Sequence, residues 1–267
     1  MMLSLVACGL KKPEDASNDK QGVSEDNSLQ YILDKGTLVL GLDDNFPPMG
    51  FRDEEDNIVG FDIDLAQEVA KKLGVELVLE PVDWEAKEME LDTKSIDCIW
   101  NGFSITESRK EMLTLSIPYM SNSIAVVVMK DSDIKSLSDM AGKRLAIQGG
   151  SSAEDTLNSD KNKDFKATIK EVLSFGNYAT ALMDMETGGN DAVLMDSVVA
   201  NYMINYLDKD YMILEETLKA EEYAIGFRKG ELALAEAIND ALREVKAEGT
   251  LAKISEKWLG EDFTVVE

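Results

Sequence analysis

Short apolar runs that alternate with segments of helical period limit the fold of this chain more than any other feature. Residues 38–42, LVLGL, indicate a buried strand. One helix face follows, formed by apolar residues three or four positions apart: Phe61, Leu65, Val69 and Leu73. Gly74 is expected to end this helix, and the series continues with a strand at 75–79, a helix at 85–91 and a strand at 96–100. Such strand–helix–strand units predict a parallel sheet with helices on its faces.

A second series of the same kind follows Pro118 and Tyr119. Its expected strands lie at 124–129, 145–147, 169–173, 192–195 and 223–227. A helix is expected from about Ser152 and another at 178–186, and two more, at 232–246 and 251–258, end the chain. Because no low-complexity spacer separates the two α/β series, we expect two lobes joined by extended strands.

The charge of the chain is strongly negative, with 27 Lys and Arg against 52 Asp and Glu among 267 residues and a net charge of −25. Such a surface repels phosphate backbones, so we expect no nucleic-acid partner. A negative field attracts cationic small molecules, although solubility is the simpler explanation. The chain has no histidine, which is the commonest general base and metal ligand. The acidic run 53–57 lacks the ligand spacing of a calcium loop and is expected to be a solvated turn. The composition therefore disfavours catalysis, and we expect no metal or cofactor.

Cys8 lies in a different context from the second cysteine, Cys98, which sits in an apolar run and is expected to be buried. The residues before Cys8, Leu5-Val6-Ala7, resemble the lipobox at which bacterial lipoproteins are cleaved and acylated. Residues 11–28 are polar and have no apolar period, as in a flexible tether. None of the seven residues before Cys8 is Lys or Arg, so we interpret 1–8 as the remnant of a truncated lipoprotein signal and 9–28 as the tether. No segment approaches the roughly 20 apolar residues of a membrane span, so we expect a lipid anchor.

Two groups of polar residues follow expected strands, where open α/β folds bind ligands. In the run 104–109, SITESR, Thr106 is a good N-cap. The free N–H groups of that helix start, together with Arg109, suit an anion such as a carboxylate. A surface arginine beside a capping threonine explains the same residues. Asp196 follows the strand 192–195 and places a carboxylate at the edge of the sheet, although it is equally suited to cap the next helix.

Residues 60–70, GFDIDLAQEVA, resemble the signature of the bacterial extracellular solute-binding proteins of family 3, the receptors for polar amino acids. Further segments match in order and spacing: 41–43 with Pro47-Pro48, 96–97, 104–109, 118–119, 148–152, 191–196 and 249–251. The match runs from about residue 36 to 260. It implies an extracytoplasmic, lipid-anchored component of an amino acid ABC importer. Such a protein is a monomer, is not an enzyme, and delivers its ligand to permease subunits in the membrane.

The resemblance also implies roles for five residues that would hold the ligand backbone. Arg109 and the backbone N–H of Ser152 would bind the α-carboxylate. Asp196, the Gly102 carbonyl and the Ser104 hydroxyl would bind the α-ammonium group. The family often has a serine where this chain has Gly102, which is expected to leave more room beside the ligand.

Four further residues are expected to select the ligand side chain. Phe46 and Trp84 match the aromatic positions that sandwich it in the family, and such a box suits an aliphatic stem or a guanidinium. Asp43 matches an acid that meets a basic or amide group, and Asn101 lies in the same region. We therefore expect a cationic L-amino acid, arginine ahead of lysine, with glutamine or cystine next. Core packing by the aromatic rings, and ordering of its own turn by Asp43, are the alternatives.

The architecture that follows is the type II periplasmic-binding fold, an α/β fold of two lobes joined by a two-strand hinge. Lobe 1 is expected to comprise residues 29–121 and 223–267, and lobe 2 residues 122–222. Crossovers near 121–123 and 221–222 would form the hinge, and a ligand held by both lobes would close them. The rival hypotheses are a dehydratase for prephenate or arogenate on the same fold, with Asp43 or Asp196 as acid or base, and the sensor domain of a receptor.

Overall fold

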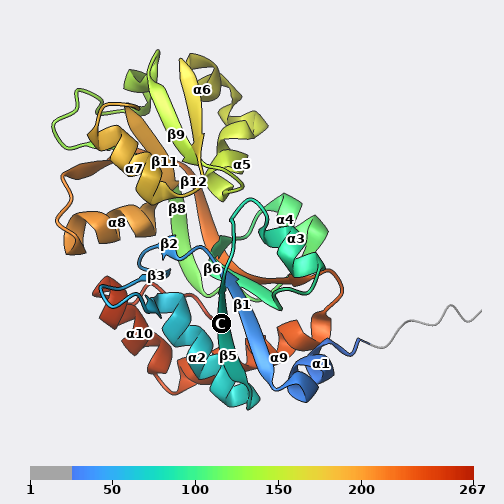
Figure 1. The fold of residues 1–267 in the computed structure, drawn as a ribbon. Helices are drawn as coiled ribbons and strands as arrows, with labels where there is room; N and C mark the ends of the chain where they lie inside the picture. Colours follow the sequence, from blue (N-terminus) through green and yellow to red (C-terminus); the bar gives the residue numbers. More distant parts are fainter. Residues whose placement is uncertain (1–25) are drawn as a thin grey trace, which may run out of the picture.

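The computed structural model describes residues 26–267, which fold into two α/β lobes stacked end to end (Figure 1). Cys8 and residues 9–25 of the predicted tether lie outside this range. One mixed sheet runs through both lobes in the order β10-β9-β11-β8-β12-β6-β1-β5, with β7 paired to β12. The predicted α/β fold of two lobes, which the family resemblance implied, is therefore correct. The apolar pattern predicted strands buried between helices, but the parallel sheet that it indicated is wrong in part, because β8 and β12 pair antiparallel with their neighbours.

The first lobe lies at the bottom of Figure 1. Its strands in the large sheet are β1 (Thr37–Leu42), β5 (Glu76–Pro81), β6 (Cys98–Ser104) and β7 (Leu113–Leu115). Its helices are α1 (Ser28–Lys35), α2 (Phe61–Leu73), α3 (Lys87–Asp92), α4 (Glu107–Met112), α9 (Leu232–Ala247) and α10 (Thr250–Leu259). Residues Phe61, Leu65 and Val69 of α2 are fully buried, and Gly74 ends that helix with a left-handed φ of 72°. Cys98 is buried as a free thiol.

The second lobe lies at the top of Figure 1. Its strands are β9 (Arg144–Gln148), β10 (Glu171–Phe175) and β11 (Ala192–Asp196). Its helices are η1 (Leu137–Met140), α5 (Ser152–Asn158), η2 (Asp160–Asn162), α6 (Lys163–Thr168), α7 (Tyr178–Glu186) and α8 (Ser197–Tyr206). β9 runs parallel to β10 and β11, so the residues that follow β9 and β11 meet at one edge of the sheet.

Two long antiparallel strands connect the lobes, β8 (Met120–Met129) and β12 (Tyr211–Arg228). They pair Asn122 with Glu221 and Ser121 with Glu222 between the two lobes. The sequence predicted β12 only at 223–227. Residues 215–222, EETLKAEE, are mostly charged and five of these eight residues are exposed, so they carry no apolar signal.

Other elements were also missing from the prediction. A small antiparallel sheet is formed by β2 (Asn45–Phe46), β3 (Gly50–Arg52) and β4 (Ile58–Val59). The acidic run between β3 and β4 is a turn in which Asp53 accepts hydrogen bonds from the backbone N–H groups of Glu55 and Asn57. Ser28 begins α1 and is buried, and its hydroxyl accepts a hydrogen bond from the Leu234 N–H. The tether predicted for 9–28 therefore extends too far at this end.

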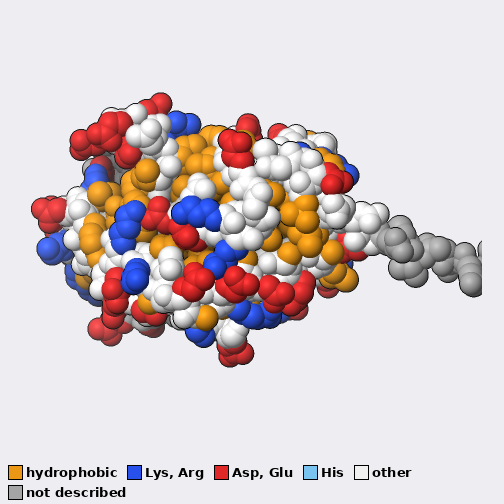
Figure 2. Space-filling model, turned by 90° about the horizontal axis from the view of Figure 1, so that it is seen from below, with side chains coloured by type: hydrophobic (Ala, Val, Ile, Leu, Met, Phe, Trp, Pro, Cys, Tyr) orange, Lys and Arg blue, Asp and Glu red, His pale blue; other side chains and the backbone are white. Residues whose placement is uncertain are grey.

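Acidic side chains are spread over the face of the molecule that is seen from below. Figure 2 shows Asp and Glu side chains at many separate places on the face seen from below, with Lys and Arg among them. Within residues 26–267, no helix combines the length and the apolar character that crossing a bilayer requires.

Candidate functional site

Six of the nine predicted ligand-binding residues meet where the two lobes face each other. A small cavity of about 10 Å³ there is lined from both lobes by Phe46, Trp84, Gly102, Arg109, Gln148, Ser151, Ser152 and Asp196. Six of these residues were predicted from the sequence, and Gln148 and Ser151 were not. A larger hollow of about 540 Å³ lies beside α1 and contains none of them. Size alone therefore does not locate the site.

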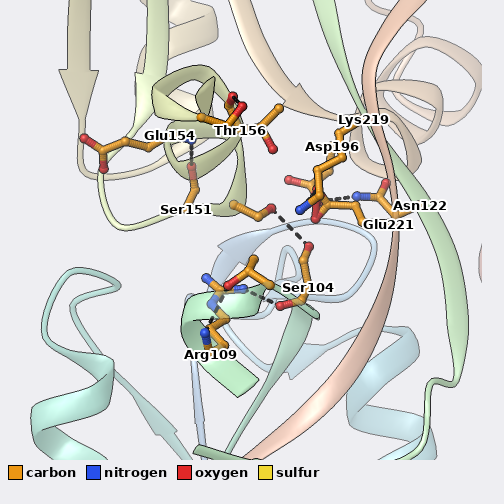
Figure 3. A network of polar contacts seen from close by, with 12 residues as sticks. Ser104, Arg109, Asn122, Ser151, Glu154, Thr156, Asp196, Lys219 and Glu221 are labelled. Carbon is orange, nitrogen blue, oxygen red and sulfur yellow. Dashed lines mark hydrogen bonds and ion pairs between the residues drawn. The ribbon is translucent and has the colours of Figure 1, made fainter. Parts of the chain in front are cut away.

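Arg109 is a buried cation at the first-lobe side of the cavity (Figure 3). The Thr106 hydroxyl caps α4 by accepting a hydrogen bond from the Arg109 N–H at 3.2 Å. The guanidinium lies over the Phe103 ring, 3.9 Å from its centroid, and donates to the Ser104 carbonyl at 2.8 Å and to the Gly150 carbonyl at 3.4 Å. Arg109 is thus not a surface arginine. Burial lowers its pKa, yet a guanidinium remains charged at neutral pH, and both of these acceptors are uncharged carbonyls. This arrangement suits an anionic ligand group.

Ser104 and Ser152 form a contact between the lobes next to Arg109. The Ser152 hydroxyl donates to the Ser104 hydroxyl at 3.0 Å. Ser152 is the first residue of α5, as predicted, and Ser151 caps this helix by accepting from the Glu154 N–H. Ser151 therefore fixes the start of α5 at the cavity.

Asp196 is a buried carboxylate at the second-lobe side of the cavity. It accepts hydrogen bonds from three residues on three elements: Asn122 of β8 at 2.6 Å, Tyr223 of β12 at 2.7 Å and Tyr178 of α7 at 3.1 Å. Its side chain forms no capping bond with α8, so the capping alternative is wrong. Burial, followed by the nearby Glu221 carboxylate, raises the pKa of Asp196 to about 7.

Gly102 has a left-handed φ of 55°, which favours glycine. A Cβ atom there would lie 2.7 Å from the Phe46 ring and 3.2 Å from the Tyr223 ring. The expected extra room is therefore absent, because these two rings occupy it. The Gly102 N–H donates to the buried Asp62 carboxylate at 2.7 Å, which fixes this turn of β6.

Asp43 and Asn101 are not among the residues that line the cavity. Asp43 is buried and accepts from the Asn45 N–H at 2.9 Å and from the Gln148 side-chain amide, across the lobes, at 2.7 Å. Asn101 accepts from the Asp43 N–H at 3.2 Å. Burial raises the pKa of Asp43. Asp43 thus orders its own turn and also contacts the other lobe. The signal for Gln148 was its place after the strand at 145–147, at the edge where ligands bind.

Phe46 and Trp84 both line the cavity and are 6% and 7% exposed. The Phe46 ring lies 5.8 Å from Tyr178, and Trp84 packs edge-on against Phe103 at 6.1 Å. Lys87, which the sequence did not single out, places its Nζ 4.9 Å from the Trp84 ring. Both aromatic residues therefore pack in the core and present a face to the site.

Comparisons with known proteins identify the family and the fold of the chain. The sequence profile of the bacterial extracellular solute-binding proteins, family 3, matches residues 38–261. The L-cystine-binding protein TcyJ of Escherichia coli K12 is 31% identical over 243 residues, which cover 90% of this chain and 89% of TcyJ. The structure of a substrate-binding protein of an ABC uptake transporter from Streptococcus pneumoniae, with bound histidine, is 36% identical with a TM-score of 0.86 and covers 91% of this chain and 99% of that one. An ancestral arginine-binding protein bound to glutamine is 42% identical with a TM-score of 0.77 and covers 85% and 99%.

Proposed function

The chain belongs to the bacterial extracellular solute-binding proteins of family 3, and we propose that it binds a cationic L-amino acid between its lobes for an ABC importer. The general part of this function follows from the family and its relatives, which are amino-acid-binding components of ABC transporters and not enzymes. The proposal concerns the ligand, the residues that hold it, and the movement that binding produces.

The observation that carries the proposal is the pair of buried, opposite charges on the two sides of the cavity. The Arg109 guanidinium comes from the first lobe and the Asp196 carboxylate from the second. An amino acid zwitterion carries the two complementary charges a short distance apart. Arg109 and the Ser152 N–H bind its carboxylate, and Asp196, the Gly102 carbonyl and the Ser104 hydroxyl bind its ammonium group.

Closure of the lobes is the proposed response to ligand. Residues 29–121 and 223–267 move as one lobe against 122–222, with β8 and β12 as the hinge near the Asn122–Glu221 pair. A zwitterion that touches both lobes binds the closed arrangement more tightly than an open one, and this difference in affinity drives closure. The permease subunits then recognise the closed form.

Selection of the side chain rests on Asp43, Phe46, Trp84 and Asn101. Two aromatic faces and a buried carboxylate suit a planar cation, so arginine comes before lysine. One contact favours a second candidate, a neutral polar ligand such as glutamine or cystine. The Asp43 carboxylate already accepts a hydrogen bond from Gln148 at 2.7 Å. This bond stabilises the buried carboxylate without a cation in the ligand side chain.

Cys8 is proposed as the site of lipid attachment, on the strength of the Leu5-Val6-Ala7-Cys8 segment alone. The protein would then be held at the outer face of the cell membrane. Mass spectrometry of the N-terminal peptide from the native membrane fraction would identify an acylated Cys8 or an unmodified one.

A thermal-shift screen of the twenty amino acids with ornithine and cystine tests the proposed function. A ligand at 100 times its Kd stabilises a protein by about 2.7 kcal/mol, which is several degrees in Tm. We expect arginine to give the largest shift and glutamate and the branched aliphatic amino acids to give none. No shift with any amino acid would contradict the proposal.

A further inference from the structure

Aromatic side chains of the two lobes meet at a contact that lies outside the ligand cavity. Phe51 of β3, in the first lobe, has its ring centroid 6.0 Å from that of Tyr202 of α8, in the second lobe, and the two rings are tilted by 54°. This distance lies in the range of favourable aromatic pairs. Neither ring lines the cavity between Arg109 and Asp196, so contact with the ligand does not explain the pair.

Each of the two rings is also packed within its own lobe. Phe51 lies edge-on to Trp258 of α10 at 5.7 Å, and the Trp258 indole N–H donates to the Asp64 carboxylate of α2 at 2.7 Å. Tyr202 stacks on Tyr206, one turn further along α8, at 5.2 Å. These contacts join residues of one lobe, so they persist whether the lobes are open or closed. Of these three ring pairs, only Phe51 and Tyr202 join different lobes.

The end of α8 makes a further contact with the first lobe. Gly260 ends α10 with a left-handed φ of 82°. A Cβ atom at Gly260 would lie 2.5 Å from the Tyr206 hydroxyl oxygen, so the glycine leaves room for that tyrosine. Figure 1 shows α8 above β3 and α10. Because Tyr202 and Tyr206 are four residues apart, one face of α8 makes both contacts with the first lobe.

Both rings lie close in the chain to residues that line the ligand cavity. Asp196 ends β11 and α8 begins at the next residue, so the helix that carries Tyr202 is attached directly to this carboxylate. In the first lobe, Phe46 pairs with Gly50 in the small sheet, and Phe51 is the next residue. Phe46 and Asp196 both line the cavity. A shift of α8 relative to β3 therefore moves two walls of the cavity relative to each other.

We propose that Phe51 and Tyr202 are positioning residues for ligand binding, whose rings hold α8, and with it Asp196, against the first lobe in the closed arrangement. The inference rests on the proposed function, in which ligand binding closes the lobes. The two rings separate when the lobes open, so the pair stabilises the closed form alone and raises the affinity. Because neither ring touches the ligand, the gain in affinity is the same for every amino acid that the site accepts.

The expected size of the effect follows from the one contact that opening breaks. Loss of an aromatic pair corresponds to about 2- to 10-fold in an equilibrium constant. Tyr202→Leu and Phe51→Leu should each raise the Kd by about this factor, for L-arginine and for L-glutamine alike. Tyr202→Phe retains the ring and should bind as the wild type does. The stacking of Tyr202 on Tyr206 is present in both forms, so its loss changes the stability of the protein and not the Kd.

Isothermal titration calorimetry on the full chain, with L-arginine and with L-glutamine, measures these affinities. Tyr31→Leu is the matched control, because Tyr31 lies on α1, is 40% exposed, and has its cation–π partners Lys35 and Lys94 in the same lobe. The Phe51→Leu/Tyr202→Leu protein completes a double-mutant cycle. If the two rings act through their mutual contact, the double variant should bind about as weakly as either single variant.

The outcomes separate this inference from the proposed function. Wild-type or tighter binding by Tyr202→Leu and Phe51→Leu, or losses that add in the double variant, would overturn the inference and leave amino acid binding intact. A loss for only one of the two amino acids would also overturn it, because the rings would then act on the ligand side chain. Failure of the wild type to bind either amino acid would contradict the proposed function and the inference together. If Tyr202→Leu does not fold, Phe51→Leu tests the same contact from the other lobe.

Discussion

The Lys87 ammonium group of α3 donates a hydrogen bond to the Gly150 carbonyl at 3.0 Å, across the boundary between the lobes. Lys87 is only 2% exposed, and it also donates to the Trp84 carbonyl at 2.9 Å. Arg109 reaches the same Gly150 oxygen at 3.4 Å. Two cations of the first lobe thus donate hydrogen bonds to one carbonyl of the second lobe. These bonds exist only when the two lobes lie close together.

Replacement of Lys87 by methionine should weaken ligand binding without harming the fold. Methionine fills the same apolar space, while the charge-assisted bond to Gly150 is lost from the closed arrangement alone. We expect a loss of about 1–2 kcal/mol, or roughly 5- to 30-fold in Kd for L-arginine. Calorimetry measures the affinity, and small-angle scattering with saturating and partial ligand measures closure. Lys71→Met, on the exposed surface of α2, is the control. Equal affinity in all three proteins would show that Lys87 does not stabilise closure.

Arg109→Ala should abolish useful binding. Removal of one member of a desolvated charge pair costs roughly 2–5 kcal/mol, which is about 30-fold to several thousand-fold in affinity. Phe103 and Thr106 retain their places in β6 and beside α4, so the circular dichroism spectrum should not change. Calorimetry with L-arginine compares the variant with Arg243→Ala on the exposed face of α9. A folded Arg109→Ala protein with wild-type affinity would remove Arg109 from the proposed carboxylate contact.

Local patterns predicted the elements that bury one face, and tertiary contacts decided the rest. The buried apolar face of α2 and the end of this helix at Gly74 depend on residues within one or two helix turns in the sequence. The environment of Asp196 does not, because Asn122, Tyr178 and Tyr223 are brought to it by β8, α7 and β12. Lys87 and Glu221 are of residue types that usually lie on the surface, yet both are buried here.

Asp62 should make the stability of the protein fall as the pH rises. This carboxyl is fully buried at the start of α2, and burial raises its pKa from the ordinary value of 3.8 to about 7. Because the folded state holds its proton more tightly than the unfolded state does, the free energy of unfolding decreases between about pH 4 and pH 7, by up to about 1.4 kcal/mol per pH unit.

Asp62→Asn isolates this contribution. Asparagine keeps an oxygen that accepts from the Gly102 N–H and cannot ionise, so the variant should lose that share of the slope and exceed the wild type in stability at about pH 8. Urea unfolding at about pH 5 and pH 8 measures both proteins. Glu68→Gln, a half-exposed carboxylate on the same helix, should retain the wild-type slope. An unchanged slope in Asp62→Asn would mean that Asp62 stays ionised when buried.

Asp43→Asn distinguishes a cationic ligand from a neutral one. If the Asp43 carboxylate pairs with a guanidinium, the substitution removes a buried charge partner and should weaken L-arginine by about 2 kcal/mol or more, roughly 30-fold. L-glutamine has no cation in its side chain and should lose much less. Calorimetry with both amino acids on the wild type and the variant gives the difference directly.

The contact between Asp43 and Gln148 decides how the result is interpreted. Asp43 orders its turn through the Asn45 N–H and holds Gln148 at 2.7 Å, and asparagine retains an acceptor for only one of these donors at full strength. Gln148→Ala removes the second contact, together with the hydrogen bond from Gln148 to the Gly176 carbonyl at 3.1 Å, and leaves the Asp43 carboxylate in place. If Asp43 serves a cation, Gln148→Ala should keep or improve the preference for arginine while Asp43→Asn loses it. Asp43→Asn and Gln148→Ala could instead each lose the same affinity for arginine as for glutamine. That result would mean that Asp43 stabilises the contact between the lobes and does not select the ligand.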